Sequence, residues 1–432
     1  MNPMQGGPPV SLARQVPNVA LETKAPRRRA NILAPFRFHD FRLLWFGLLI
    51  SNLGTWMQIT TLGYLVVAFA APSASKAALY VGILGASSAV PVVLLSPIAG
   101  VVADRFPRRR VLMITNSLQA FTALILALLV TFNVLQLWEI FVLAGFRSTT
   151  QAFDAPARQS WVPLLVPREY VGNAIGLNSL AFNGPAVVGP PIAGFLILAV
   201  GSAPSFYVNT VTTLAVIVAL IFMAPSAPSS KTREGVFASI LSGLRFLFGH
   251  SVLRQVAVLL MITCLFVRPY TQLLPAYAAH VVFVDARGLG VMLAASACGG
   301  IVGALITAVV GSRRRGAVWF ASAVVQSLCF IVLGLVHVYA VALAVLVLLG
   351  AAVLSFAGSS NVMIQTLSPD DMRGRAISVF SMIMLGVVPA GSLVLGSIAT
   401  AIGLSYAIVA GGAISLLVAA LVYASDPQLR RI

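Results

Sequence analysis

The feature that most constrains this chain is a series of long apolar stretches between Leu43 and Tyr423, separated by short polar breaks. A helix needs about 20 apolar residues to cross the hydrocarbon core of a bilayer. The stretches are continuously apolar, whereas strands of a membrane barrel alternate apolar and polar residues over about 10 positions. The pattern therefore predicts an all-α membrane protein with twelve transmembrane helices. These cover residues 43–70, 78–103, 111–131, 138–157, 173–199, 206–224, 252–278, 288–310, 317–336, 340–364, 376–401 and 404–424.

The charged residues indicate how the chain crosses the membrane. Only 9% of residues are charged, and the formal net charge is +17. Of the 28 Lys and Arg residues, Lys76 and Arg287 fall in loops of one side and Arg147 and Arg268 fall inside spans, which leaves 24 on the other side. Short loops rich in Lys and Arg face the cytoplasm. We therefore expect a multi-pass protein of the plasma (inner) membrane with both termini cytoplasmic. The basic charge is interpreted as topology, not as a nucleic-acid-binding surface.

The sequence offers no pattern for catalysis or for a bound cofactor. Cys264, Cys298 and Cys329 are isolated within apolar stretches, so we expect neither a disulfide framework nor a metal site. A Walker sequence of the form GxxxxGK[ST] is missing, which argues against an ATP-driven motor in this chain. Acids and histidines form no constellation at membrane depth, so we expect no enzyme activity.

The two halves of the chain resemble each other. Residues 167–175 align with residues 369–377 at an offset of 202, and residues 108–110 correspond to residues 313–315 at an offset of 205. Parallel repeats in transporters are related by an axis along the membrane normal. We expect six-helix halves over 43–224 and 252–424. A disordered basic tail is expected over 1–42 and a short tail over 425–432. The linker over 225–251 either carries an amphipathic helix at the cytoplasmic interface or simply joins the halves.

Several segments resemble a known family. The stretch from Gly100 to Arg109, GVVADRFPRR, resembles the signature loop G-x-x-x-D-R-x-G/P-R-R of the major facilitator superfamily, between the second and third spans. Residues 38–45, 152–159, 177–183 and 369–375 resemble its drug- and siderophore-exporting branch, of the transmembrane secretion effector type, to which the enterobactin exporter belongs. Two features depart from the pattern. Pro185-Ala186 stands where these exporters often carry Ala-Arg, and the second copy of the signature lacks the Asp.

The resemblance implies that the signature loop gates the transporter by latching the two halves in the outward-facing state. Charge-assisted pairs between Asp104 and nearby arginines can hold helix ends together. Asp154, at the cytoplasmic end of the fourth span, is a candidate partner for Arg105. The alternative is that the arginines only fix topology, which we favour for Arg110. The expected gating residues are Gly100, Asp104, Arg105, Arg108, Arg109 and Asp154.

Charged residues inside spans are candidates for binding and coupling. An arginine at the bilayer centre costs about 2.5–3.5 kcal/mol on insertion scales, so it usually faces a cavity or a partner. Arg268, which precedes the helix-breaking Pro269, is a candidate binder of an anionic or catecholate group. The alternatives are a structural pair with Asp285 and snorkelling to the outer surface. Arg147 and Glu139 are candidates for proton coupling, although Glu139 beside a tryptophan also fits an interfacial anchor. Asp104 and Asp154 are further coupling candidates.

Polar residues on spans that the resemblance assigns to the central cavity are candidates for substrate contact. The 51/55/58 spacing puts three polar side chains on one helical face, which either packs against another helix or faces the cavity. The expected cavity residues are Asn52, Gln58, Arg268, Tyr270, Gln272, Asn361 and Gln365. In the fifth span, Pro185, Gly189, Pro190 and Gly194 resemble the antiporter-type motif that bends this helix and seals the cavity.

These features predict a secondary active transporter that works by alternating access. We expect proton-coupled efflux of a small amphipathic molecule, a siderophore or a drug-like compound, by a monomer in the lipid bilayer. The alternatives are uptake of a small metabolite by the same fold and a transport-inactive membrane sensor.

Overall fold

The structure is a computed structural model, and it describes residues 32–70, 73–224, 236–310 and 315–425. The first half contains α1 (His39–Ala70), α2 (Ala74–Arg105), α3 (Arg108–Thr131), α4 (Leu137–Trp161), α5 (Val171–Asn183), α6 (Pro185–Val200) and α7 (Ala203–Phe222). The second contains α9 (Ser251–Phe266), α10 (Tyr270–His280), α11 (Ala286–Val309), α12 (Arg315–Leu335), α13 (Tyr339–Leu367), α14 (Asp370–Met382), α15 (Val388–Ile402) and α16 (Leu404–Ser425).

The twelve expected spans are all occupied by helices. Ten helical stretches in the described residues are long and apolar enough to cross a membrane. α15 is a shorter apolar helix that continues α14 through a π-helical segment, Ile383–Val387. α4 has spanning length, 25 residues, but carries charged side chains that lower its hydropathy. The described residues contain helices and no strand, so the expected all-α membrane fold is confirmed.

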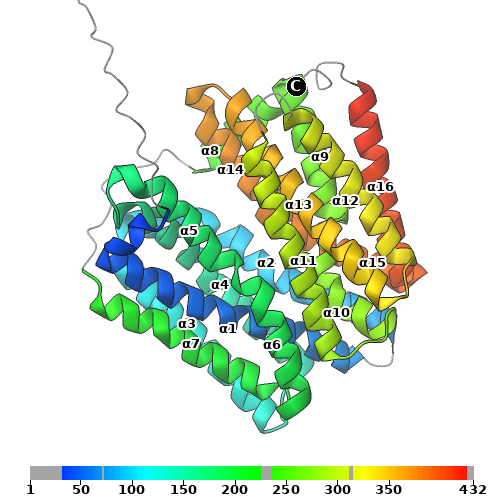
Figure 1. Cartoon of the computed structure of the whole chain (residues 1–432), viewed down its shortest axis with the longest axis horizontal. Coiled ribbons are helices and arrows are strands. Elements are labelled where there is room, and N and C mark those ends of the chain that lie inside the picture. The colour runs from blue at the N-terminus through cyan, green and yellow to red at the C-terminus, as the bar shows by residue number, and fades with distance from the viewer. Residues whose placement is uncertain (1–31, 71–72, 225–235, 311–314, 426–432) are drawn as a thin grey trace, which may run out of the picture.

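The helices form two bundles, which lie at an angle to each other and meet near α6, α10 and α11 (Figure 1). We call the membrane face with the loops at 105–110 and 370–375 the basic side, and the other face the opposite side. Helix α8 (Val236–Gly249) lies between the halves in sequence and packs against α14. The two helices approach closely, because a Cβ added at Gly243 of α8 would lie only 2.6 Å from the carbonyl oxygen of Arg375 on α14. Of the tail expected over 1–42, residues 32–42 are described and contain a 3-10 helix, Ala34–Arg37, and the start of α1. Residues 1–31 of that tail, linker residues 225–235, repeat residues 311–314 and residues 426–432 of the tail expected over 425–432 lie outside the described residues.

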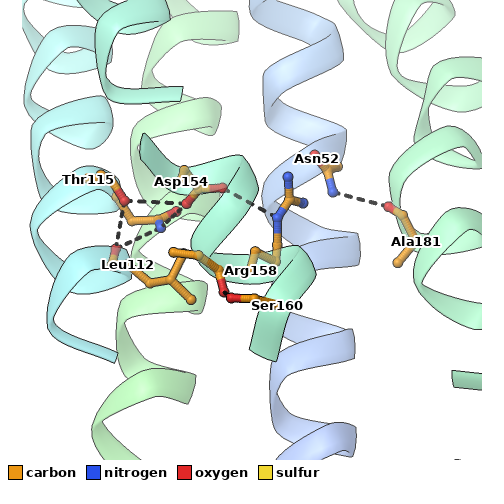
Figure 2. Close-up of polar contacts among 9 residues, drawn as sticks. Asn52, Leu112, Thr115, Asp154, Arg158, Ser160 and Ala181 are labelled. Atoms are coloured by element: carbon orange, nitrogen blue, oxygen red, sulfur yellow. Dashed lines mark hydrogen bonds and ion pairs between the residues drawn. The ribbon is translucent and has the colours of Figure 1, made fainter. Parts of the chain in front are cut away.

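The fifth span is broken where α5 gives way to α6. Pro185 has no N–H, so the carbonyl of Ala181 has no helical partner one turn later. The side-chain amide of Asn52, on α1, donates to that carbonyl oxygen at 3.2 Å (Figure 2). One turn along α1, the Trp56 indole donates to the Phe182 carbonyl oxygen at 3.4 Å. Side chains of the first span therefore satisfy backbone groups at the break in the fifth.

The two halves touch at the opposite side through backbones that approach very closely. A Cβ on Gly194 of α6 would lie 2.3 Å from the carbonyl oxygen of Ala286 on α11. A Cβ on Gly396 of α15 would lie 2.7 Å from the carbonyl oxygen of Ala78 on α2. The two glycines are 202 residues apart, which is the offset of the aligned loops. Small residues permit such contacts between membrane helices. Each half of the repeat contributes one glycine of this kind.

The hydrogen bond at the break in the fifth span gives a testable prediction. Asn52→Ala leaves the Ala181 carbonyl unpaired and should lower the free energy of unfolding by about 1 kcal/mol. In a Pro185→Ala background the restored backbone N–H at position 185 binds that carbonyl, so the same Asn52→Ala change should be nearly neutral. Denaturant titration of the four variants in detergent measures the cycle. Equal effects of Asn52→Ala in both backgrounds would show that the carbonyl is not its partner.

Candidate functional site

A cavity of about 610 Å³ lies between the two halves. Its wall comes from α1, α5 and α6 of the first half and from α11, α13, α14–α15 and the α9–α10 junction of the second. Most of the wall is apolar or glycine. Its polar and aromatic members include Trp56, Ser179, Asn183, Arg268, Tyr270 and Ser296. A volume in the range of about 300–1,000 Å³, with a few polar groups in an apolar wall, is typical of small-molecule sites.

Arg268 is the charged side chain of this wall within the described residues. It lies where α9 ends and α10 begins, because Pro269 interrupts the helix. Its Nη1 atom is buried and makes no hydrogen bond or ion pair in the part of the chain that the structure describes. The alternative pairing with Asp285 is wrong, because Asp285 caps α11 through the Gly288 N–H at 3.0 Å and pairs with Arg287 at 3.5 Å. Arg268 therefore lies on the cavity wall without a partner among the described residues.

Tyr270 also lies on the cavity wall, as the sequence predicted. Its hydroxyl hydrogen-bonds to the hydroxyl of Ser296, which joins α10 to α11. Trp56 is on the facing wall, where its indole is bonded to the backbone of α5. Trp56 was not among the cavity residues expected from the sequence. Its position four residues after Asn52, on the same helical face, was the signal that it shares the side toward α5.

The polar stripe at 51/55/58 packs against another helix and does not face the cavity. Gln58 is fully buried, and its side-chain oxygen accepts a hydrogen bond from the amide of Asn209 on α7. Thr55 donates to the Asn209 side-chain oxygen at 3.5 Å. The expected cavity role of Gln58 is therefore corrected, because polar groups in a membrane are also satisfied at helix–helix interfaces.

The other expected cavity residues lie elsewhere in this conformation. Asn52 is bonded to the break in the fifth span and is not among the lining residues. Gln272 lies at the closed contact between the halves, where a Cβ on Gly85 of α2 would be 2.6 Å from its Oε1 atom. Asn361 and Gln365 hydrogen-bond to each other, one turn apart on α13. Of the seven residues expected at the cavity, the lining therefore includes Arg268 and Tyr270.

A buried polar cluster lies near the basic end of α4 (Figure 2). The Asp154 carboxylate accepts hydrogen bonds from Asn116 at 2.9 Å and Thr115 at 3.3 Å. It also forms an ion pair with Arg158 at 3.3 Å, and the Arg158 guanidinium lies 5.1 Å from the ring centre of Phe182. The expected pairing of Asp154 with Arg105 is thus not found here. The i, i+4 spacing of Asp154 and Arg158 was the sequence signal that the analysis missed.

Two arginines of the signature loop bind helices of their own half. The Arg108 Nε atom donates to the Ser160 hydroxyl at 3.0 Å, and the Arg109 Nη2 atom donates to the Ile221 carbonyl oxygen at 2.8 Å, near the end of α7. Cations at a helix C-terminus interact favourably with its free carbonyls. Arg105 is exposed, and the side chain of Asp104 lies outside the described part of the structure. A gating role for the loop stays a prediction.

Two of the four coupling candidates, Glu139 and Arg147, lie away from the cavity wall. Glu139 belongs to a capping box at the start of α4, where its Oε2 atom accepts from the Gln136 N–H at 2.8 Å. This structural role accounts for an acid at that position. The Arg147 side chain makes no hydrogen bond or ion pair with described residues and is not among those that line the cavity.

The cavity opens toward the basic side. Its lining reaches Ala304 and Leu305, near the basic end of α11. A Cβ added at Gly100, Gly172 or Gly176, near the basic ends of α2 and α5, would have no atom within 4 Å. Gly176 itself lines the cavity. At the opposite side, Gly194 and Gly396 are pressed against the other half. The structure is therefore closed on one face of the membrane and open on the other.

Two six-helix halves around a cavity that opens to one face define a membrane transporter of the major facilitator type. The fold is similar to that of the nucleoside transporter NupG, solved as the D323A mutant, with a TM-score of 0.70 and 16% sequence identity over 89% of this chain and 98% of that chain. Residues 30–430 match the family described as transmembrane secretion effector, and the chain belongs to this family.

Curated relatives cover most of the chain. The multidrug efflux pump Tap of Mycolicibacterium fortuitum is 27% identical over 376 residues, which are 84% of this chain and 90% of the pump. The staphyloferrin A transporter of Staphylococcus aureus is 26% identical over 381 residues, 86% of this chain and 91% of that protein. The resemblance inferred from the signature loop is thereby confirmed. The chain is a transporter and not an enzyme.

The buried cluster on α4 gives a stability prediction. Asp154→Asn leaves the buried Arg158 guanidinium without its counter-charge and should lower the free energy of unfolding by about 3 kcal/mol. Asp285→Asn is the matched control, since it removes an exposed pair while Asn still caps a helix, and it should change stability by less than about 0.5 kcal/mol. Both are measured by denaturant titration in detergent. Equal destabilisation by the two variants would contradict the pairing in Figure 2.

Proposed function

We propose that this transporter exports a small amphipathic molecule, a siderophore or a drug-like compound, by alternating access. The observation that carries the proposal is a drug-sized cavity, open at the basic side and closed at the opposite side by backbone contacts. An apolar wall with a few polar groups suits a cargo that has both characters. Two relatives, a multidrug efflux pump and a staphyloferrin A transporter, support these cargo classes.

Alternating access requires the open side to close when the other side opens. We propose that the basic side is cytoplasmic, by the positive-inside rule, and that the cavity accepts cargo there. Rigid-body rocking of the halves would then bring the glycines near the basic ends of α2 and α5 against the other half. In that outward-facing state, Asp104 and Arg105 would latch the halves. The sequence predicts proton coupling through Glu139, Arg147, Asp104 or Asp154 as the energy source, and a drive by the membrane potential is the alternative that flux measurements distinguish. We expect the protein to act as a monomer.

Gly176 offers a test of the closure. A Cβ added at Gly176 would have no atom within 4 Å in the present conformation, so we expect Gly176→Leu to leave folding and membrane insertion unchanged. If the basic side must close around this position, the larger side chain should reduce export at least tenfold. Gly249→Leu, at an equally open position at the end of α8, is the control and should transport normally. Export activity at matched protein levels is the measurement. Normal export by Gly176→Leu would argue against closure at α5.

Export itself is tested by gene deletion. Small molecules in medium and cytoplasm are compared by untargeted mass spectrometry, with and without iron limitation. A cargo should accumulate inside the deletion strain and fall in the medium, and the wild-type gene should restore both. The Asp104→Asn/Arg105→Gln variant should insert normally and fail to restore them. A compound that instead falls inside and remains in the medium would indicate uptake, and no change in any compound would overturn the export proposal.

A further inference from the structure

The charge on the cavity wall bears on both the cargo and its driving force. We propose, on the basis of the proposed function above, that the cargo is an amphipathic anion that pairs with Arg268, and that the membrane potential acting on this anion drives its export. A proton exchanged at a cavity carboxylate is not required. The inference rests on an unpaired guanidinium and on the kinds of side chain around it.

Arg268 is placed to bind an anion. It lies at the junction of α9 and α10, and its buried Nη1 atom makes no hydrogen bond or ion pair within the described residues. A guanidinium stays charged at any physiological pH and has five N–H donors. An intramembrane charge without a partner is expensive unless a cavity or a ligand serves it. A carboxylate, sulfonate or catecholate would supply charge-assisted hydrogen bonds at this wall.

The rest of the cavity suits the apolar body of such an anion. Trp56 lies on the wall from the first half, and Leu293, Ile301 and Val353 lie on the wall from the second. Aromatic and aliphatic walls bind rings and chains through burial of apolar surface. The chemistry that this site recognises is therefore an apolar or aromatic group that carries a negative charge.

The wall holds no obvious group for proton exchange. Among the described residues that line the cavity there is no Asp, Glu or His. The Cys264 thiol on α9 and the Tyr270 phenol on α10 lie within electrostatic reach of Arg268, and thiols and phenols are ordinarily uncharged at neutral pH. Asp154 and Asp285 already pair with Arg158 and Arg287. A change of pH across the membrane therefore has no evident site at the cavity on which to act.

The electrical consequence follows from the charge of each state. A monovalent anion bound to Arg268 makes a neutral pair in the loaded cavity, whereas the empty cavity carries one positive charge. Each export cycle therefore moves one negative charge outward. A potential that is negative inside favours this movement. Since a unit charge gains about 2.3 kcal/mol per 100 mV and a tenfold ratio corresponds to about 1.4 kcal/mol, about 60 mV sustains a tenfold gradient of a monovalent anion.

Binding is tested with two probes that differ by one charged group. 8-Anilinonaphthalene-1-sulfonate is an anion, and N-phenyl-1-naphthylamine is the same skeleton without the sulfonate. Both are titrated by fluorescence against the protein in lipid nanodiscs, with empty nanodiscs as background. We expect Arg268→Gln to weaken binding of the sulfonate at least tenfold and to change binding of the neutral probe less than twofold. Retained binding of the neutral probe also shows that the variant cavity is folded.

Two control variants separate the charge at Arg268 from other effects. Arg268→Lys keeps a positive charge at the same position and should retain most of the preference for the sulfonate. Arg287→Gln removes an exposed guanidinium at the opposite side of the membrane and should bind both probes like the wild type. Equal affinity of the wild type for the two probes, or loss of sulfonate binding in Arg287→Gln, would overturn the assignment of the anion site.

The driving force is tested in proteoliposomes loaded with the sulfonate probe, with protein-free liposomes as background. The probe is present at equal concentration inside and outside at the start. We expect a valinomycin–potassium potential of about 60 mV, negative inside, to make the internal concentration about tenfold lower than the external one, and a pH gradient of one unit alone to leave the two equal. Flux that follows the pH gradient, or no flux of the sulfonate at all, overturns the inference. The gene-deletion experiment distinguishes failure of this inference from failure of the proposed function. If the deletion shows export of a neutral cargo, the export function stands and only the inference about an anion is overturned.

Discussion

The close approach of backbones at one face of the membrane is the constraint on which the rest of the structure depends. Gly194 and Gly396 let α6 and α15 contact the carbonyls of α11 and α2 at distances that any Cβ would prevent. Because helices in lipid gain little from apolar burial against one another, such packing and local hydrogen bonds hold the halves together. With that face closed, the halves diverge toward the other, and the cavity lies between them.

The arginines of this chain illustrate two ways in which a membrane protein accommodates a buried cation. Arg158 pairs with Asp154 of its own helix, whose carboxylate Thr115 and Asn116 also bind, and it has the Phe182 ring beside it. Arg268 has no such partner among the described residues and lies on the cavity wall. Since a buried charge without a counter-charge destabilises the fold, we assign Arg158 a structural role and Arg268 a ligand-binding role. Arg147 also has no side-chain partner among the described residues, but it does not line the cavity. This contrast separates the two sites better than their positions in sequence do.

The symmetry of the fold extends to its details. The glycines that close α6 against α11 and α15 against α2 are one repeat apart. Both the fifth and the eleventh spans are also interrupted, one by a proline and one by a π-helical segment. Interrupted helices bend more readily than continuous ones. The two spans that approach the other half most closely are therefore also the two that are best able to change shape.

The sequence by itself determined the all-α membrane fold, the repeat and the superfamily, because hydrophobic length, loop charge and the signature loop are local properties of the chain. It also singled out Arg268 and Tyr270, since an arginine before a proline inside an apolar stretch needs a cavity or a partner. Tertiary structure decided which polar groups meet. Asn52 binds a carbonyl that Pro185 leaves free, Gln58 binds a neighbouring helix, and Asp154 pairs with Arg158. A polar side chain on a membrane helix is equally well satisfied by a cavity, a backbone carbonyl or another side chain, and only the packing of distant helices determines which of these it contacts.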